Sequence, residues 1–247
     1  MSSRLVIIPT FNEIENIERI LRKVLGLEPH FDILVIDDHS PDGTAVTVKQ
    51  IQEEHRDRIH LLERSGKLGL GTAYITGFHW ALEKGFKFIF EMDADFSHNP
   101  EDLVRLFDAC MNGADLAIGS RYITGVNVVN WPMGRVLISY FASQYVRFIT
   151  RMKIKDSTAG FICYRERVLR TINLDKIRFK GYAFQIEMKF NAWKHGFVLE
   201  EVPIIFTDRK EGKSKMSGKI VYEAIWGVIT MKISSWFKSY KKAAITT

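Results

Sequence analysis

The sequence has few cysteines and no long apolar run. Its 247 residues include only two cysteines, Cys110 and Cys163, with no CxxC spacing, which excludes a disulfide scaffold and a four-thiolate zinc site. No stretch of about 18 consecutive apolar residues occurs, so no transmembrane helix is expected. The apolar run Leu5–Ile8 stops at Pro9, before the core of a signal peptide would be complete. We therefore expect a reduced, cytoplasmic protein that meets a membrane only by lying on its surface.

Acidic residues are scarce only at the C-terminal end of the chain. The sequence holds 35 Lys and Arg against 29 Asp and Glu, a net charge of +6, and residues 205–247 carry nine of the basic and three of the acidic residues. A chain whose charge is balanced up to residue 204 and basic only at its end is not expected to bind nucleic acid over a broad surface. This distribution favours a local contact with phosphate or with an anionic membrane surface. With 46% hydrophobic residues, disordered and fibrous classes are excluded.

Short apolar segments alternate with amphipathic ones in the first half of the chain. This alternation is typical of a parallel sheet covered by helices on both faces. The second half is mixed, and because neither a linker nor a repeat divides the chain, we predict one compact α/β unit whose first half binds a nucleotide. The expected strands are Leu5–Ile8, Ile33–Ile36, Ile59–Leu62, Phe86–Met92, Ala114–Gly119, Ala159–Tyr164 and Phe197–Phe206. The expected helices are Glu13–Leu25, Thr44–Glu54, Gly71–Lys84, Pro100–Met111, Arg135–Met152, Tyr182–His195 and Gly218–Lys242.

Polar clusters follow the first, second and fourth expected strands, at Pro9–Glu13, Asp37–Thr44 and Asp93–His98. The carboxyl ends of the strands line one crevice in an open α/β sheet, so these clusters should converge. Each cluster taken alone is explained equally well as a helix cap, a role that Asn12 and Asp42 suit. Three clusters at one edge favour a ligand site.

Asp93 and Asp95 stand two residues apart just beyond an apolar strand. In extended backbone both carboxylates point to one side, where they repel each other unless a cation lies between them. Mg²⁺ or Mn²⁺ suits this position, because such ions take oxygen ligands and fill their remaining positions with water and substrate phosphates. The pair therefore predicts a divalent metal and a diphosphate ligand.

The glycine-rich stretch Gly66–Ala73 matches neither the dinucleotide fingerprint nor the P-loop, which disfavours both kinds of nucleotide site. Its glycines are expected to let the backbone turn tightly into the next helix, and a phosphate-cradling role stays open.

The expected helices Arg135–Met152 and Gly218–Lys242 each have one polar and one apolar face. Within 135–152 a polar face recurs every four residues opposite an apolar one, and within 218–242 an apolar stripe faces small and basic residues. Either helix could be an ordinary surface helix packed on the domain, or an element that meets phosphate and lipid. The polar face comprises Arg135, Ser139, Ser143, Arg147 and Arg151, and the apolar one Leu137, Phe141, Tyr145, Phe148 and Met152. The C-terminal stripe comprises Val221, Ile225, Ile229, Ile233, Trp236 and Tyr240.

Taken together, an ordered set of motifs from about residue 4 to 220 resembles the dolichol-phosphate (polyprenol-phosphate) mannosyltransferase family. The motifs are Pro9–Glu13, Asp37–Thr44, Gly69–Tyr74, Asp93–His98, Gly119–Tyr122, Gly181–Met188, Asp208–Arg209 and Gly212–Lys215. The resemblance implies an inverting, metal-dependent glycosyltransferase with the GT-A fold, a Rossmann-like α/β fold with a mostly parallel central sheet. Such an enzyme moves mannose from GDP-mannose to a polyprenyl phosphate and releases GDP.

The resemblance also implies roles for individual residues. The guanosine part of the donor corresponds to Pro9, Phe11, Glu13, Ile36 and Asp38, and the metal and diphosphate to Asp93, Ala94 and Asp95. Arg209 and Lys215 match a loop over the donor phosphates, and Arg121, Arg135 and Ser139 match the acceptor-phosphate site. Asp95 and Arg121 are the expected catalytic residues. Two positions depart from the family pattern: Phe11 replaces the usual Tyr, and Ser97 stands where some relatives place a Gln metal ligand.

The expected acceptor removes the need for a general base. A phosphate monoester is largely dianionic at pH 7 and already nucleophilic, so we expect direct displacement with inversion. Residues 1–217 should form the catalytic domain, with a nucleotide half to about 120 and an acceptor half from 121, and residues 218–247 an amphipathic helix on the cytoplasmic face of a membrane. The resemblance also allows a membrane-anchoring subunit as partner. A UDP-sugar glucosyltransferase and a non-catalytic membrane-surface adaptor are the alternatives, and nucleic-acid binding is disfavoured.

Overall fold

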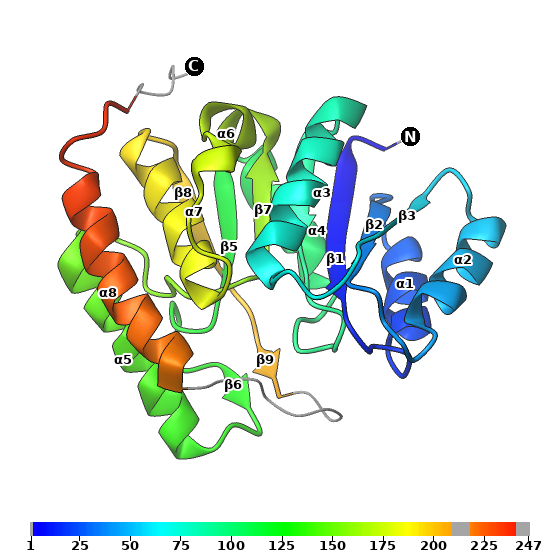
Figure 1. The fold of residues 1–247 in the computed structure, drawn as a ribbon, viewed down its shortest axis with the longest axis horizontal. Coiled ribbons are helices and arrows are strands. Elements are labelled where there is room, and N and C mark those ends of the chain that lie inside the picture. The colour runs from blue at the N-terminus through cyan, green and yellow to red at the C-terminus, as the bar shows by residue number, and fades with distance from the viewer. Residues whose placement is uncertain (1, 209–217, 241–247) are drawn as a thin grey trace.

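A seven-stranded sheet forms the centre of the protein (Figure 1). The computed structural model describes residues 2–208 and 218–240. The strand order is β3-β2-β1-β4-β7-β5-β8, and every neighbouring pair is parallel except the two made by β7, which runs antiparallel to β4 and β5. This confirms the prediction of a mostly parallel sheet. The strands are β1 (Arg4–Thr10), β2 (Asp32–Asp37), β3 (Ile59–Glu63), β4 (Phe88–Glu91), β5 (Leu116–Ser120), β7 (Ile162–Arg165) and β8 (Leu199–Pro203).

Alternating side chains of the central strand β1 enter two separate cores. Leu5 and Ile7 belong to the core on one face of the sheet, and Val6 and Ile8 to the core on the other. This is the period-two pattern of a strand buried on both faces. The first face is covered by α3 (Leu70–Lys84), α6 (Glu166–Thr171) and α7 (Tyr182–Lys194), the second by α1 (Ile17–Leu25), α2 (Thr44–Glu54) and α4 (Asp102–Met111).

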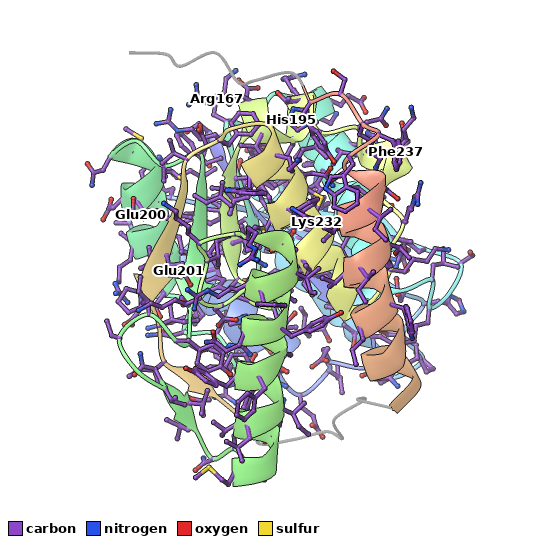
Figure 2. The ribbon with its side chains drawn as sticks, turned by 90° about the vertical axis from the view of Figure 1, so that its left-hand side faces the viewer. Arg167, His195, Glu200, Glu201, Lys232 and Phe237 are labelled. Carbon is purple, nitrogen blue, oxygen red and sulfur yellow. The ribbon has the colours of Figure 1, made fainter. Side chains whose placement is uncertain are left out.

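Two long helices, α5 (Met133–Thr150) and α8 (Gly218–Ser234), lie side by side beyond α7 (Figure 1). The hydroxyl of Tyr145 on α5 donates to the carbonyl of Ile225 on α8 over 3.0 Å. Figure 2 shows the same pair from the side, with Lys232 and Phe237 at the C-terminal end of α8. A short parallel ribbon of β6 (Val128–Val129) and β9 (Phe206–Thr207) lies near the N-terminal end of α5 (Figure 1).

Most predicted elements are confirmed to within a few residues, and the differences have local causes. The last helix ends at Ser234 instead of Lys242, because the amide of Ser235 already bonds to the carbonyls of Met231 and Lys232 in a closing turn. The predicted strand Phe197–Phe206 is two strands, since Pro203 has no amide hydrogen to continue the ladder of β8. Helix α6, the 3₁₀ turn Leu174–Lys176 and β6 were not predicted. Cys110 and Cys163 are free and buried.

Candidate active site

A cavity of about 1030 Å³ opens where β1, β2 and β4 end, so the three polar clusters converge as predicted. This edge of an open α/β sheet is the usual place for a ligand. Of the predicted site residues, Ile36 instead lies with its side chain fully buried in the core, and Arg209 and Lys215 lie outside the described residues. Those that line the cavity are Pro9, Phe11, Glu13, Asp38, Asp93, Ala94, Asp95, Ser97, Arg121, Arg135 and Ser139.

The loops that carry these side chains hold non-glycine residues in the left-handed region. The φ angles are +59° for Asn12, +60° for His39 and +58° for Phe96, one residue in each polar cluster. Such angles are uncommon without glycine and concentrate at functional sites. Asn12 does not cap a helix, because α1 begins only at Ile17, whereas Asp42 does accept from the amide of Thr44 at the start of α2. Gly43 is the N-cap residue of α2 and receives no side-chain cap, so neither candidate is the cap residue itself, although Asp42 supports the helix start from one residue before it.

The end of the cavity near Asp38 is braced by Arg64, a residue that the sequence did not single out. Its Nε donates to Asp38 Oδ1 over 2.6 Å, and its Nη1 donates to Thr72 Oγ1 over 2.8 Å. Arg64 thus links the end of β2, through its ion pair with Asp38, to the start of α3, through its hydrogen bond with Thr72. Lys67 lies with its Nζ 4.6 Å from the ring centroid of Phe11, and both residues line the cavity.

At two positions of the stretch Gly66–Ala73 the structure requires a glycine. Gly69 has a φ of +104°, and a Cβ at Gly71 would come within 2.9 Å of the ring of Phe184. Gly69 therefore permits the turn into α3, and Gly71 permits close packing of α3 on α7. The expected tight turn is confirmed, while phosphate cradling stays a prediction.

The carboxylate end is formed by Asp93, Asp95 and Ser97. Asp95 Oδ1 accepts from the amide of Ser97 over 3.0 Å, and the Ser97 hydroxyl is buried without a hydrogen-bond partner among the described residues. Over residues 2–208 and 218–240, no group of three or more His, Cys, Asp or Glu side chains could by itself hold a metal ion. Protein ligands here would be two carboxylates and a hydroxyl, which suits a hard cation that also binds phosphate oxygens.

His98 lies beside this carboxylate end and stays neutral. Its ring stacks on Phe161 with centroids 4.8 Å apart and meets the ring of Phe206 edge-on at 5.3 Å. Burial lowers the pKa of His98 to about 4. At neutral pH it therefore adds no positive charge beside Asp93 and Asp95.

Beneath the carboxylates lies a buried polar group made by Glu91, Gln185 and Lys189. Glu91 accepts a hydrogen bond from Gln185 Nε2, and Lys189 Nζ donates to the carbonyls of Ala159 and Gln185 over 2.5 and 3.2 Å. Burial raises the pKa of Glu91 to about 8 and lowers that of Lys189 to about 8. None of these residues was predicted to have a role, although a Glu inside the predicted apolar strand Phe86–Met92 is a signal that could have marked them.

Arg121 lines the cavity and is held by a buried carboxylate. Its Nε and Nη2 donate to Asp156 Oδ2 and Oδ1 over 2.7 and 2.6 Å, and Nη2 also donates to Thr158 Oγ1 over 2.8 Å. The guanidinium carbon lies 5.5 and 5.6 Å from the ring centroids of Trp131 and Phe206. Although burial alone would raise the pKa of Asp156, the positive charge of Arg121 holds it below its ordinary value.

Arg135 and Ser139 reach the cavity from the first turns of α5, as the helical spacing predicted. Arg135 Nη1 donates to Asp208 Oδ1 over 2.7 Å, and its guanidinium carbon lies 4.1 Å from the ring centroid of Trp131. The predicted polar face does not continue exposed along the helix, because Ser143 is fully buried. Met152 likewise lies in the core, beyond the end of α5, and not on an apolar outer face.

Beyond the arginines the cavity continues between α5 and α8 as an apolar groove. Its walls there are Leu137, Ile138, Phe141, Ala142, Tyr145, Ile225 and Val228. The two helices and the turn after α8 together carry more than half of the exposed large hydrophobic side chains of the described chain, among them Phe141, Phe148, Trp226, Ile233, Trp236 and Phe237. Of the predicted C-terminal stripe, Ile225, Ile233 and Trp236 are exposed, and α8 packs inward through Gly227 and Val228. Among the described helices, none is long and apolar enough to cross a bilayer.

Comparison with known proteins places these features in a family. Residues 5–175 match the model of glycosyl transferase family 2. The chain is 47% identical to the polyprenol monophosphomannose synthase of Mycolicibacterium smegmatis over 94% of its length and 86% of that protein. It is 47% identical to the undecaprenyl-phosphate mannosyltransferase of Micrococcus luteus, over 91% of this chain and 93% of the relative. A dolichol-phosphate mannosyltransferase of Pyrococcus furiosus is 38% identical over 88% of this chain, which spans 60% of that protein.

Solved structures share the fold at low sequence identity. A glucosyl-3-phosphoglycerate synthase of Mycobacterium tuberculosis, solved with Mn²⁺, UDP and glucosyl-3-phosphoglycerate, superimposes with a TM-score of 0.67 at 15% identity, over 93% of this chain and 78% of that one. A mannosyltransferase from Pyrobaculum calidifontis, solved with GDP-Man and Mn²⁺, gives 0.59 at 15% identity, over 98% and 66%. These likenesses confirm the predicted GT-A fold.

Proposed function

The chain belongs to glycosyl transferase family 2, and we propose that it transfers mannose from GDP-mannose to a polyprenyl phosphate, releasing GDP. The observation that carries this proposal is one cavity in which a carboxylate pair, two arginines and an apolar groove follow one another. The carboxylate pair suits the metal-bound diphosphate of a nucleotide sugar. The two arginines suit the phosphate of the acceptor, and the apolar groove suits its hydrocarbon chain. The curated relatives at 47% identity, which are named for mannosyl transfer to polyprenyl phosphates, support the same reaction.

The donor nucleoside is assigned to the end of the cavity formed by Phe11, Glu13 and Asp38. Glu13 and Asp38 offer carboxylate acceptors that suit the donor N–H groups of guanine and the hydroxyls of ribose. Arg64 fixes the carboxylate of Asp38 through a hydrogen bond of 2.6 Å, so this acceptor is oriented before the nucleotide arrives. Pro9 lines the same end, and Arg209 and Lys215 complete the proposed donor contacts from outside the described residues.

Asp93 and Asp95 are proposed to hold Mg²⁺ or Mn²⁺, with the Ser97 hydroxyl as a third protein ligand. Ser97 fits because its oxygen is buried, lines the cavity and has no other partner among the described residues. The bound ion would neutralise the donor diphosphate and the charge that develops on departing GDP. Ala94 lies between the two carboxylates and lines the cavity with them.

Arg121, Arg135 and Ser139 are proposed to bind the acceptor phosphate. Two guanidinium groups suit a dianion, and they lower its repulsion from the donor diphosphate. The phosphate oxygen is nucleophilic without a base, so the neutral His98 does not have to remove a proton. Its attack on the anomeric carbon from the side opposite the diphosphate gives the inverted, β-linked product.

The apolar groove and the exposed face of α5 and α8 are proposed to meet the lipid. The groove continues directly from Arg135 and Ser139, so a chain attached to the bound phosphate would enter it. Exposed aromatic side chains beside basic ones suit the head-group layer of a membrane. We therefore propose peripheral attachment to the cytoplasmic face of a membrane, with an anchoring subunit as an additional partner.

The proposal is tested by incubating the protein with Mn²⁺, radiolabelled GDP-mannose and polyprenyl phosphate, and extracting the lipid product. Transfer is expected for the wild type and should be abolished in Asp95→Ala. The control Asp108→Ala removes an exposed carboxylate on α4 and should keep normal transfer. Absence of labelled lipid with GDP-mannose but its formation with a labelled UDP-sugar would overturn the mannosyl assignment, and near-normal transfer by Asp95→Ala would overturn the metal site.

A further inference from the structure

Gln185 is a buried polar side chain that lines the reaction cavity. It lies in the first turn of α7, is 4% exposed, and shares the cavity with Asp93 and Asp95. Its hydrogen-bond partner Glu91, at the end of β4, lies 94 residues earlier in the sequence. Its bond to Glu91, two residues before Asp93, brings it to the part of the cavity where the proposed metal and diphosphate site lies.

The orientation of the Gln185 amide is fixed by Glu91. Nε2 of Gln185 donates to Oε2 of Glu91, which is a hydrogen-bond acceptor. The amide nitrogen therefore faces the floor of the site. The Oε1 atom of Gln185 has no hydrogen-bond partner among the described residues. A buried amide carbonyl left unpaired is costly, so a ligand that donates to it gains affinity.

The surroundings of the amide select the kind of ligand. Gly160, which also lines the cavity, borders the amide on its Nε2 side, where a Cβ would lie at an ordinary contact distance of 3.6 Å. A carbonyl oxygen does not attract the oxygens of a diphosphate, which are themselves acceptors. It does accept from a hydroxyl, and the hydroxyl-rich part of a nucleotide sugar beyond the diphosphate is the hexose.

We propose that Gln185 is a sugar-binding residue whose Oε1 accepts a hydrogen bond from a hydroxyl of the donor hexose, with Glu91 as the positioning residue that orients the amide. This inference rests on the proposed function. Lys189 supports the arrangement, because its Nζ bonds to the carbonyls of Ala159 and Gln185 and so ties the first turn of α7 to the chain before β7.

The test compares binding of GDP with binding of GDP-mannose, each with Mn²⁺, by titration calorimetry. Gln185→Met keeps the length of the side chain and removes the acceptor. Its affinity for GDP-mannose should fall about three- to ten-fold, the effect of one neutral hydrogen bond, while its affinity for GDP should stay within about two-fold of the wild type. The control Gln52→Met makes the same change on α2, where the amide bonds to the carbonyl of Ile59 away from the cavity, and should change neither affinity.

Glu91→Met is the second variant, because it removes the acceptor of Gln185 Nε2 with little change in side-chain length if Gln185→Met does not fold. Without that acceptor Gln185 is no longer held in one orientation, so GDP-mannose should bind more weakly with GDP unchanged. Equal losses for GDP and GDP-mannose, or no loss for either, would overturn the sugar contact. Failure of the wild type to bind either nucleotide would instead overturn the proposed function, and the inference with it.

Discussion

Arg121 and Asp156 form a buried, two-pronged ion pair, with Nε donating to Oδ2 over 2.7 Å and Nη2 to Oδ1 over 2.6 Å. The carboxylate also accepts from the backbone amide of Arg121 over 2.9 Å, so backbone and side chain are fixed together. A guanidinium held in this way presents one orientation to an incoming phosphate. Asp156 thereby positions the residue to which acceptor binding is assigned.

Asp156→Asn should therefore weaken both the fold and the acceptor site. Removing one partner leaves a buried, unpaired guanidinium, and we expect a loss of about 3 kcal/mol in the free energy of unfolding, or about 6 to 12 °C in Tm. The KM for polyprenyl phosphate should rise more than the KM for the donor. Differential scanning calorimetry and initial rates measure the two effects. Asp175→Asn, which breaks an exposed pair with His79, is the control and should change neither; an equally stable Asp156→Asn would contradict the argument.

Burial of Glu91 predicts a pH dependence of stability. Its pKa is raised from 4.5 to about 8, so between these values the folded protein holds a proton that the unfolded chain has released, and stability falls as pH rises. His98 acts oppositely below pH 6.5, because its pKa is lowered to about 4 and acid favours the unfolded chain. The window from about pH 6.5 to 7.5 thus reports mainly on buried acids, because Lys189, whose pKa is lowered to about 8, opposes this slope only toward pH 8 and above.

In that window the free energy of unfolding, measured by urea denaturation, should fall by at most about 1.4 kcal/mol per pH unit for this group. Glu91→Gln should flatten the slope. Glu187, whose pKa is also raised by burial, adds to the wild-type slope, so the difference between wild type and variant is the quantity to compare. A variant with the full wild-type slope would show that Glu91 is ionised in the folded state.

Much of this site could be predicted from the sequence because parallel strands fix where their ends lie. Asp38, Asp93 and Asp95 follow strands whose carboxyl ends must meet at one edge, whatever the rest of the chain does. The partners Asp156 and Gln185 could not be placed in this way. Asp156 precedes β7, an antiparallel strand inserted between β4 and β5, and Gln185 pairs with Glu91 across 94 residues. No local pattern encodes either contact, since both depend on the order of strands in the sheet.

The exposed aromatic face of α5 predicts membrane binding that two substitutions should remove. Phe141 and Phe148 are 62% and 67% exposed on α5. Inserting each ring into the interface is worth up to about 1.5 to 3 kcal/mol, so the double variant Phe141→Ser, Phe148→Ser should bind liposomes more than ten-fold more weakly in flotation. Val46→Ser with Met111→Ser, which removes comparably exposed side chains from α2 and α4, is the matched control. Undiminished flotation of the α5 variant would remove this face from the membrane contact.

Arg135, one of the two arginines proposed to bind the acceptor phosphate, donates from Nη1 to Asp208 Oδ1 over 2.7 Å. An arriving dianion must compete with that carboxylate. Asp208→Asn keeps the shape and removes the negative charge, so the KM for polyprenyl phosphate should fall about two- to five-fold, as expected for a pair that is about one quarter exposed. Initial rates at low and high salt measure this, and the gain should shrink as salt screens the wild-type repulsion. A higher KM at both salt concentrations would mean that Asp208 orients Arg135 for the phosphate and does not compete with it.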